Sequence, residues 1–160
     1  MHVYRLPWRY AQYAPRRFPF TKVDTTAPSY DAGPTVTVNS DDTLSVSATI
    51  SDEKSPLLDR AYVIFLSGDE GVPTGSEIFT QTGAAASPLY GGTVPNIASG
   101  ATQAIQITTQ IPGGSYVWQE AIRDNAGNYT LATDQSFTIT ANLFVDVLPM
   151  RIVRHSGRYH

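Results

Sequence analysis

The chain of 160 residues contains no cysteine, so neither disulfide bonds nor thiolate metal sites can hold its fold together. It also contains no apolar run near the roughly 20 residues that a membrane-spanning helix needs. Its first 20 residues are interrupted by Arg5, Pro7 and Arg9, and therefore lack the continuous apolar stretch of a signal peptide. We expect a fold held by packing alone, with no membrane contact and no secretory signal.

Imidazole is missing from the centre of the chain, because all three histidines (His2, His155 and His160) lie near its ends. No base is therefore available for a serine nucleophile. Adjacent acidic residues occur only on predicted turns, where neighbouring side chains point apart instead of converging as in a glycosidase. The glycines match neither the dinucleotide nor the phosphate-loop spacing. These absences predict that the protein is not an enzyme and needs no cofactor.

Basic residues are nearly absent from the middle of the chain. Residues 1–23 and 150–160 carry eight of the eleven lysines and arginines and no acid. Residues 24–149 hold the other three against all fourteen acidic residues, which is a net charge of −11. An acidic domain is thus flanked by two basic segments.

The clearest local pattern runs from residue 111 to 128. Pro112-Gly113-Gly114 favours a turn, and Asp124-Asn125-Ala126-Gly127-Asn128 favours a second one. Between them, Tyr116, Trp118 and Ile122 alternate with polar Ser115, Gln119 and Arg123, which predicts a strand with one buried and one exposed face.

Similar alternation predicts further strands at Leu44 to Ile50 and at residues 101–110, and a near-continuous apolar run predicts one at Arg60 to Leu66. Shorter patterns favour strands around Val36 to Val38 and over residues 129–140. Residues 67–100 are rich in Gly, Pro, Ser and Ala, with one short candidate strand at Glu77 to Gln81. A connection of this length indicates an exposed binding loop.

Two motifs resemble a known family. The opening Asp24-Thr25-Thr26-Ala27-Pro28, and the order Pro112-Gly113, Tyr116, Asp124-x-Ala-Gly-Asn128, are similar to fibronectin type III and bacterial immunoglobulin-like domains of bacterial and phage surface proteins. The resemblance covers residues 24–140. It implies an all-β fold, an immunoglobulin-like (fibronectin III-like) seven-stranded sandwich, with Tyr116 in the tyrosine corner. It says little about function.

Glu120 departs from the family pattern, because an inward aliphatic side chain is expected there. Either a bulge turns Glu120 outward, or it is a partly buried carboxylate that needs a partner.

Calcium is a separate hypothesis for the acidic turns. Asp124, Asn125 and Asn128, with Asp52 or Glu53 from another loop, offer hard oxygen ligands near one end of the sandwich. The motif is already explained as a turn and lacks the spacing of an EF-hand loop, so we expect no bound metal. The hypothesis rests only on the need of acidic loops for a counterion.

The terminal segments carry the functional prediction. Residues 1–23 form an extended basic, aromatic arm interrupted by prolines, and residues 141–160 form a C-terminal arm or an added strand, too apolar to stay uncovered. We expect both to bind partner surfaces; packing of the first on its own domain is the alternative. The predicted anchors are aromatic, apolar and arginine side chains: Trp8, Tyr10, Tyr13, Arg16, Arg17, Phe18, Phe144, Met150, Ile152 and Arg154.

An acidic sandwich with basic arms disfavours nucleic acid, because the domain would repel phosphate. The leading expectation is a structural protein of a tailed-phage virion, a capsid decoration or cement protein or a tail accessory, assembled in the host cytoplasm. Its partners would be other virion proteins and copies of itself. The alternative is a carbohydrate-binding or host-adhesion module that binds a host surface glycan through Tyr90 and the 67–100 loop. A hydrolase would require Glu120 to open onto a cleft beside another carboxylate.

Overall fold

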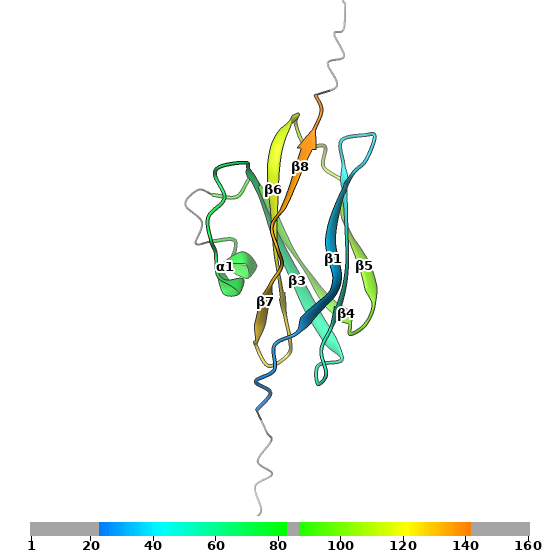
Figure 1. Cartoon of the computed structure of the whole chain (residues 1–160), viewed down its shortest axis with the longest axis vertical. Helices are drawn as coiled ribbons and strands as arrows, with labels where there is room; N and C mark the ends of the chain where they lie inside the picture. Colours follow the sequence, from blue (N-terminus) through cyan, green and yellow to red (C-terminus); the bar gives the residue numbers. More distant parts are fainter. Residues whose placement is uncertain (1–22, 83–86, 142–160) are drawn as a thin grey trace, which may run out of the picture.

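The computed structural model describes residues 23–82 and 87–141, and most of this part is β-structure arranged as two facing antiparallel sheets (Figure 1). One sheet has the order β1-β2-β5, formed by β1 (Ser29–Val38), β2 (Leu44–Ser51) and β5 (Thr102–Ile107). The other has the order β4-β3-β6-β7, and β8 also pairs with β6. Its strands are β3 (Leu57–Leu66), β4 (Tyr90–Ala98), β6 (Gly114–Arg123), β7 (Tyr129–Leu131) and β8 (Gln135–Ile139). The predicted all-β sandwich is confirmed.

The core lies between the two sheets and follows from the period-two pattern. In β2 every second residue is buried, starting at Leu44, as the sequence predicts. Trp118 of β6 is fully buried at the centre and stacks on Tyr62 of β3, with ring centroids 4.4 Å apart. Aromatic side chains of the second sheet thus fill the middle of the sandwich.

Strand β6 is confirmed, but the prediction that Gln119 lies on an exposed face of it is wrong. This residue is only 3% exposed, because the segment before a short helix covers the outer face of the second sheet. A second apolar cluster lies on that outer face, where Phe65 of β3 and Ala121 of β6 pack against Ile78. Strands buried on both faces lose the simple alternation, which explains the continuous apolar run in β3.

The helix that covers this face is α1 (Gly75–Thr80), where the sequence analysis expected a short strand. Its first turn is stabilised by a capping box: Thr74 accepts from the backbone N–H of Glu77, and the Glu77 carboxylate accepts from the backbone N–H of Thr74. Gln81 ends the helix in the left-handed conformation, with φ of 57°. The expected strand is wrong because these local caps decide the conformation.

The expectation that residues 67–100 form one long, mostly irregular connection is also wrong, because β4 occupies its last part. Gly91 and Gly92 interrupt the hydrophobic pattern of this strand. A Cβ on Gly92 would lie 2.9 Å from the hydroxyl of Tyr62, so a larger residue here would force the Tyr62 ring to shift. Pro95 is tolerated because β4 is an edge strand.

Tyr116 makes the bond predicted for a tyrosine corner. Its hydroxyl donates to the backbone carbonyl of Pro112 at 2.6 Å. At the opposite end of the sandwich (Figure 1), the amide of Asn128 donates to the carbonyls of Asp24 and Thr26 and attaches the entering chain to the β6–β7 turn. The described chain therefore enters the sandwich at one end and leaves it at the other. Within the described ranges, the structure contains no helix of the length and apolarity required to traverse a bilayer.

Candidate functional site

Glu120 is a buried carboxylate with a partner, which decides between the two alternatives stated for it. It is 1% exposed and forms a two-pronged ion pair with Arg60, with Nε to Oε1 at 2.7 Å and Nη2 to Oε2 at 2.9 Å. Trp118 donates to Oε2 and Tyr30 donates to Oε1. The remaining Nη1 of Arg60 donates to the carbonyl of Gln103. Four donors thus occupy the two oxygens of Glu120, as a buried charge requires.

This network links the two sheets. Tyr30 belongs to β1, while Arg60 and Glu120 belong to β3 and β6. Burial, together with the neighbouring Glu120 carboxylate, raises the pKa of the Tyr30 hydroxyl well above its ordinary value, so Tyr30 stays a donor. All the hydrogen-bonding capacity of Glu120 is used inside the fold, so this carboxylate has a structural role here.

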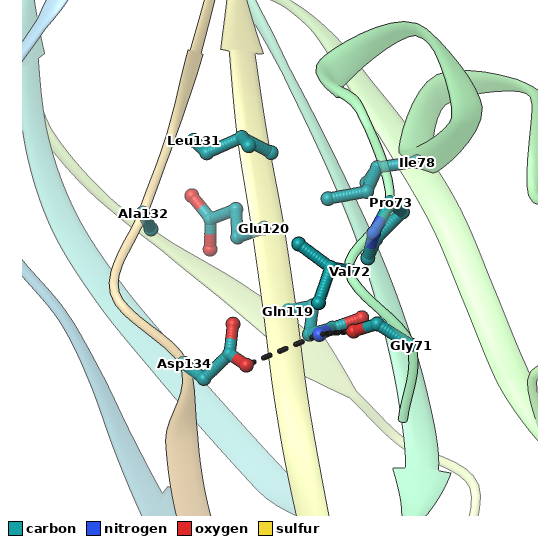
Figure 2. Close-up of a pocket in the computed structure, with 9 residues that line it drawn as sticks. All are labelled: Gly71, Val72, Pro73, Ile78, Gln119, Glu120, Leu131, Ala132 and Asp134. Carbon is teal, nitrogen blue, oxygen red and sulfur yellow. Dashed lines mark hydrogen bonds between the residues drawn. The ribbon is translucent and has the colours of Figure 1, made fainter. Parts of the chain in front are cut away.

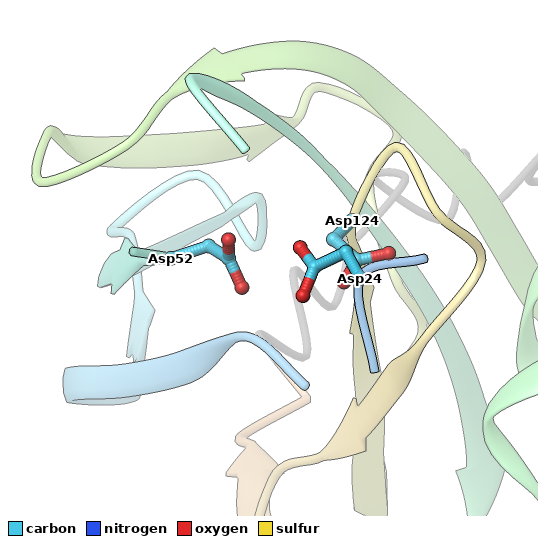
Figure 3. A group of neighbouring side chains, drawn as sticks. All are labelled: Asp24, Asp52 and Asp124. Atoms are coloured by element: carbon cyan, nitrogen blue, oxygen red, sulfur yellow. The ribbon is translucent and has the colours of Figure 1, made fainter. Parts of the chain in front are cut away.

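Three aspartates meet at the end of the sandwich where the chain enters (Figure 3). Asp24 precedes β1, Asp52 follows β2, and Asp124 follows β6. One carboxylate oxygen from each lies within 4.8 Å of the others. Oδ2 of Asp24 and Oδ2 of Asp52 are buried and have no hydrogen-bond partner among the described residues. Among the residues that the structure describes, Lys54 alone offsets their charge there, with Nζ 3.3 Å from Oδ1 of Asp24.

Each aspartate is held by its own loop. Asp52 accepts from the backbone N–H groups of Lys54 and Ser55, and Asp124 accepts from those of Ala126 and Asn128. The N–H of Thr26, and secondarily Lys54, lowers the pKa of the Asp24 carboxyl below its ordinary value, so it remains ionised. Hard carboxylate oxygens in this arrangement are the ligands that calcium prefers.

The predicted calcium ligands are brought together only in part. Asp52 and Asp124 do converge, whereas Glu53 is exposed and outside the cluster. The amide nitrogen of Asn128 donates to Oδ2 of Asp124 at 2.7 Å, so the Asn128 amide acts as a donor in this cluster. Asn125 contributes its backbone N–H to Ser55. Asp24 was missed, because only the contact between the entering chain and the β6–β7 turn brings it here.

A small pocket opens on the outer face of the second sheet, between the segment before α1 and the gap that separates β7 from β8 (Figure 2). Its volume is about 90 Å³, and Gln119 forms part of its wall. Nε2 of Gln119 donates to the carbonyl of Gly71 at 2.8 Å and to Oδ2 of Asp134 at 3.1 Å. Oε1 of Gln119 is buried without a partner among the described residues. Sequence reasoning missed this pocket, because it assigned Gln119 to the solvent.

A larger and more open depression of about 360 Å³ lies at the β6–β7 turn. Arg123 lines it, with Nη2 donating to Asp59 at 2.7 Å and its guanidinium 4.5 Å from the ring centre of Phe79. The hydrogen bond to Asp59 raises the pKa of Arg123. Asn125 and Tyr129 complete its wall, so the depression combines one aromatic ring with several polar groups.

Tyr90, the residue predicted to contact a ligand, lies at the start of β4 and is only partly exposed. Its side chain packs against the main core cluster, which gives the ring a structural role as well. The ten predicted anchors of the two arms lie outside the described residues: Trp8, Tyr10, Tyr13, Arg16, Arg17, Phe18, Phe144, Met150, Ile152 and Arg154.

Comparison with known proteins adds no identification: no protein-family model matches the chain, and no curated protein matches its sequence.

Proposed function

We propose that this chain is a non-enzymatic structural protein of a bacteriophage virion, in which the two basic arms clamp an acidic immunoglobulin-like sandwich to neighbouring subunits. The observation that carries the proposal is the separation of charge along the chain. The described residues hold thirteen acids and three bases, and each base already pairs with an acid: Lys54 with Asp24, Arg60 with Glu120, and Arg123 with Asp59. The eight other bases lie in the arms.

The immunoglobulin-like assignment is supported by the strand order. With β1, β2, β3, β5 and β6 read as strands A, B, C, E and F, one sheet has the order A-B-E. In the other sheet, β4 occupies the position of strand C′, and β7 and β8 together occupy the position of strand G. The bond from Tyr116 to Pro112 is the second support.

Binding through arms requires no chemistry at the sandwich. Arginine and aromatic side chains anchor protein interfaces, and complementary charge favours a basic arm on an acidic neighbour. The sandwich would then remain exposed on the particle while the arms carry the affinity.

The experiment compares full-length protein with a variant that lacks residues 1–20, both expressed during phage growth. We expect the variant to be missing from purified particles while its circular dichroism still reports a folded sandwich. A variant with Gln in place of Arg5, Arg9, Arg16 and Arg17 keeps the length of the arm but removes this charge, and it should be missing from the particles as well. Incorporation of the truncated protein at the full-length level would contradict the proposal.

A second candidate function is a host-adhesion module. The glycan would then bind in the depression at the β6–β7 turn and not at Tyr90 and the 67–100 loop, where the sequence predicts it. Tyr129 offers a ring for stacking, and Arg123 and Asn125 offer hydrogen-bonding groups. Binding of the full chain to a glycan array, lost in a Tyr129→Ala variant, would support adhesion. Equal binding by both proteins would exclude this site.

A further inference from the structure

We propose that the pocket between the segment before α1 and the β7–β8 gap is a socket for an arginine side chain from the N-terminal arm of a second copy of this chain. The inference rests on the proposed clamping function and names a partner for it. It starts from Gln119, which is 3% exposed and whose Oε1 accepts no hydrogen bond from any described residue. A buried acceptor without a donor is costly, so a ligand that brings a donor is favoured.

The polar side chains that line the pocket are Gln119 and two carboxylates, Glu120 and Asp134, so its polar part consists mainly of acceptors. Among its lining side chains only Gln119 can donate, and its Nε2 already serves Gly71 and Asp134. Asp134 adds a negative charge that no described base neutralises, because Lys54, Arg60 and Arg123 pair elsewhere. A ligand must therefore supply N–H donors and positive charge.

Exposed apolar side chains line the pocket beside Asp134. Val72 and Leu131 are lining residues and are 98% and 47% exposed. Figure 2 shows Val72 on the segment before α1 and Leu131 at the end of β7, with the Leu131 side chain extending over β6. Apolar groups next to these acceptors match a side chain that has an aliphatic stem and a cationic head.

Arginine fits this description better than lysine. Its planar guanidinium can direct separate N–H groups at Gln119 Oε1 and at the Asp134 carboxylate, whereas an ammonium is a compact, strongly hydrated charge. A cavity of about 90 Å³ is too small for a drug-sized ligand, for which roughly 300 Å³ or more is usual. The end of a single side chain is the occupant of suitable size.

Charge complementarity identifies the source of this arginine. The described sandwich carries thirteen acids against three bases, while residues 1–22 carry Arg5, Arg9, Arg16, Arg17 and Lys22 and no acid. An arm from a second copy thus brings arginines to a surface that lacks them.

The experiment titrates a fluorescein-labelled peptide of residues 1–22 with full-length protein and measures its anisotropy. Asp134→Asn removes the charge of an exposed residue but keeps an acceptor for Gln119, and Val72→Ser removes an apolar lining side chain at a position where folding is not at risk. We expect about tenfold weaker binding for Asp134→Asn, the size of one charge-assisted hydrogen bond. Glu53→Gln, which removes an exposed acid elsewhere, is the matched control and should change binding by less than about twofold.

The outcomes separate the two proposals. Equal binding by wild type, Asp134→Asn and Val72→Ser would overturn the socket while leaving the clamping function intact. No binding of the peptide to wild type would overturn the arm as partner in trans. A crystal structure with saturating peptide that shows only an ordered water beside Gln119 would also overturn the socket.

Discussion

Two sets of carboxylates, one inside the sandwich and one at its end, differ in how many of their oxygens accept hydrogen bonds. Inside, Glu120 accepts four hydrogen bonds, two of them from Arg60. At the end of the sandwich, Asp24 and Asp52 each keep one buried oxygen without a described partner. The internal network is complete and needs nothing from outside. The surface cluster can gain stability from an added cation, so the first group specifies the fold and the second is open to a ligand.

The largest expected effect is on the internal network. Replacing Arg60 by Met leaves the Glu120 carboxylate buried without its counter-charge, and we expect a loss of about 3–5 kcal/mol in the free energy of unfolding. Urea denaturation measures the loss. The double variant Arg60→Met/Glu120→Leu should recover part of it, because no buried charge remains. A double variant that is destabilised by the sum of both single changes would contradict the account.

The second prediction concerns the three aspartates. If Asp24, Asp52 and Asp124 bind calcium, the ion at one hundred times its Kd adds about 2.7 kcal/mol to stability. We expect a higher melting temperature in calcium than in chelator, and no difference for Asp52→Asn, which keeps an acceptor for its turn. Glu53→Gln should behave as wild type. Identical wild-type melting curves in calcium and in chelator would remove the metal hypothesis.

A smaller loss of stability is expected for Tyr116→Phe, which removes a hydrogen-bonded hydroxyl that lies nearer the surface than Glu120. The variant loses the bond from the hydroxyl to Pro112, and the freed carbonyl belongs to an exposed residue that water can reach. We expect a loss of about 1 kcal/mol by urea denaturation. A loss as large as that of Arg60→Met would contradict the difference between deep and shallow groups.

The smallest expected effect concerns how the stability of the fold changes at low pH. The pKa of Asp24 is lowered below its ordinary 3.8 in the folded chain, because the Thr26 N–H and Lys54 favour the ionised form. Its contribution is fully present above 3.8 and decreases as the pH falls through the lower folded value. The urea midpoint, measured in chelator, should therefore fall in acid, and Asp24→Asn should flatten this fall. An unchanged slope in the variant would show that Asp24 is not a source of it.

The sequence predicts the strands whose side chains alternate and misses features that depend on packing. β2 and β6 are found because a period of two marks them. α1 is missed although the spacing of Thr74 and Glu77 is a local sign of a helix start, and β4 is missed because Gly91 and Gly92 interrupt its pattern.

The candidate sites are predicted less well, because they combine residues that are distant in sequence. The requirement of Glu120 for a partner is predictable, since a buried charge must be paired. The identity of that partner depends on the β3–β6 register, which pairs Tyr62 with Glu120 and brings Arg60 within reach from two residues away. Asp24 joins the acidic cluster through contacts with residues that are distant in sequence, namely the bond from Asn128 to its carbonyl and the ion pair with Lys54.

The central claim, that the arms supply the cations that the sandwich lacks, is tested most directly by the mass of the full chain in solution. Light scattering compares wild type with a variant carrying Gln in place of Arg5, Arg9, Arg16 and Arg17, over rising protein concentration at low salt. We expect the wild-type mass to rise above the 17.4 kDa of one chain, while the variant stays at that mass. A wild type that remains at 17.4 kDa throughout, or a variant that associates equally well, would contradict the account.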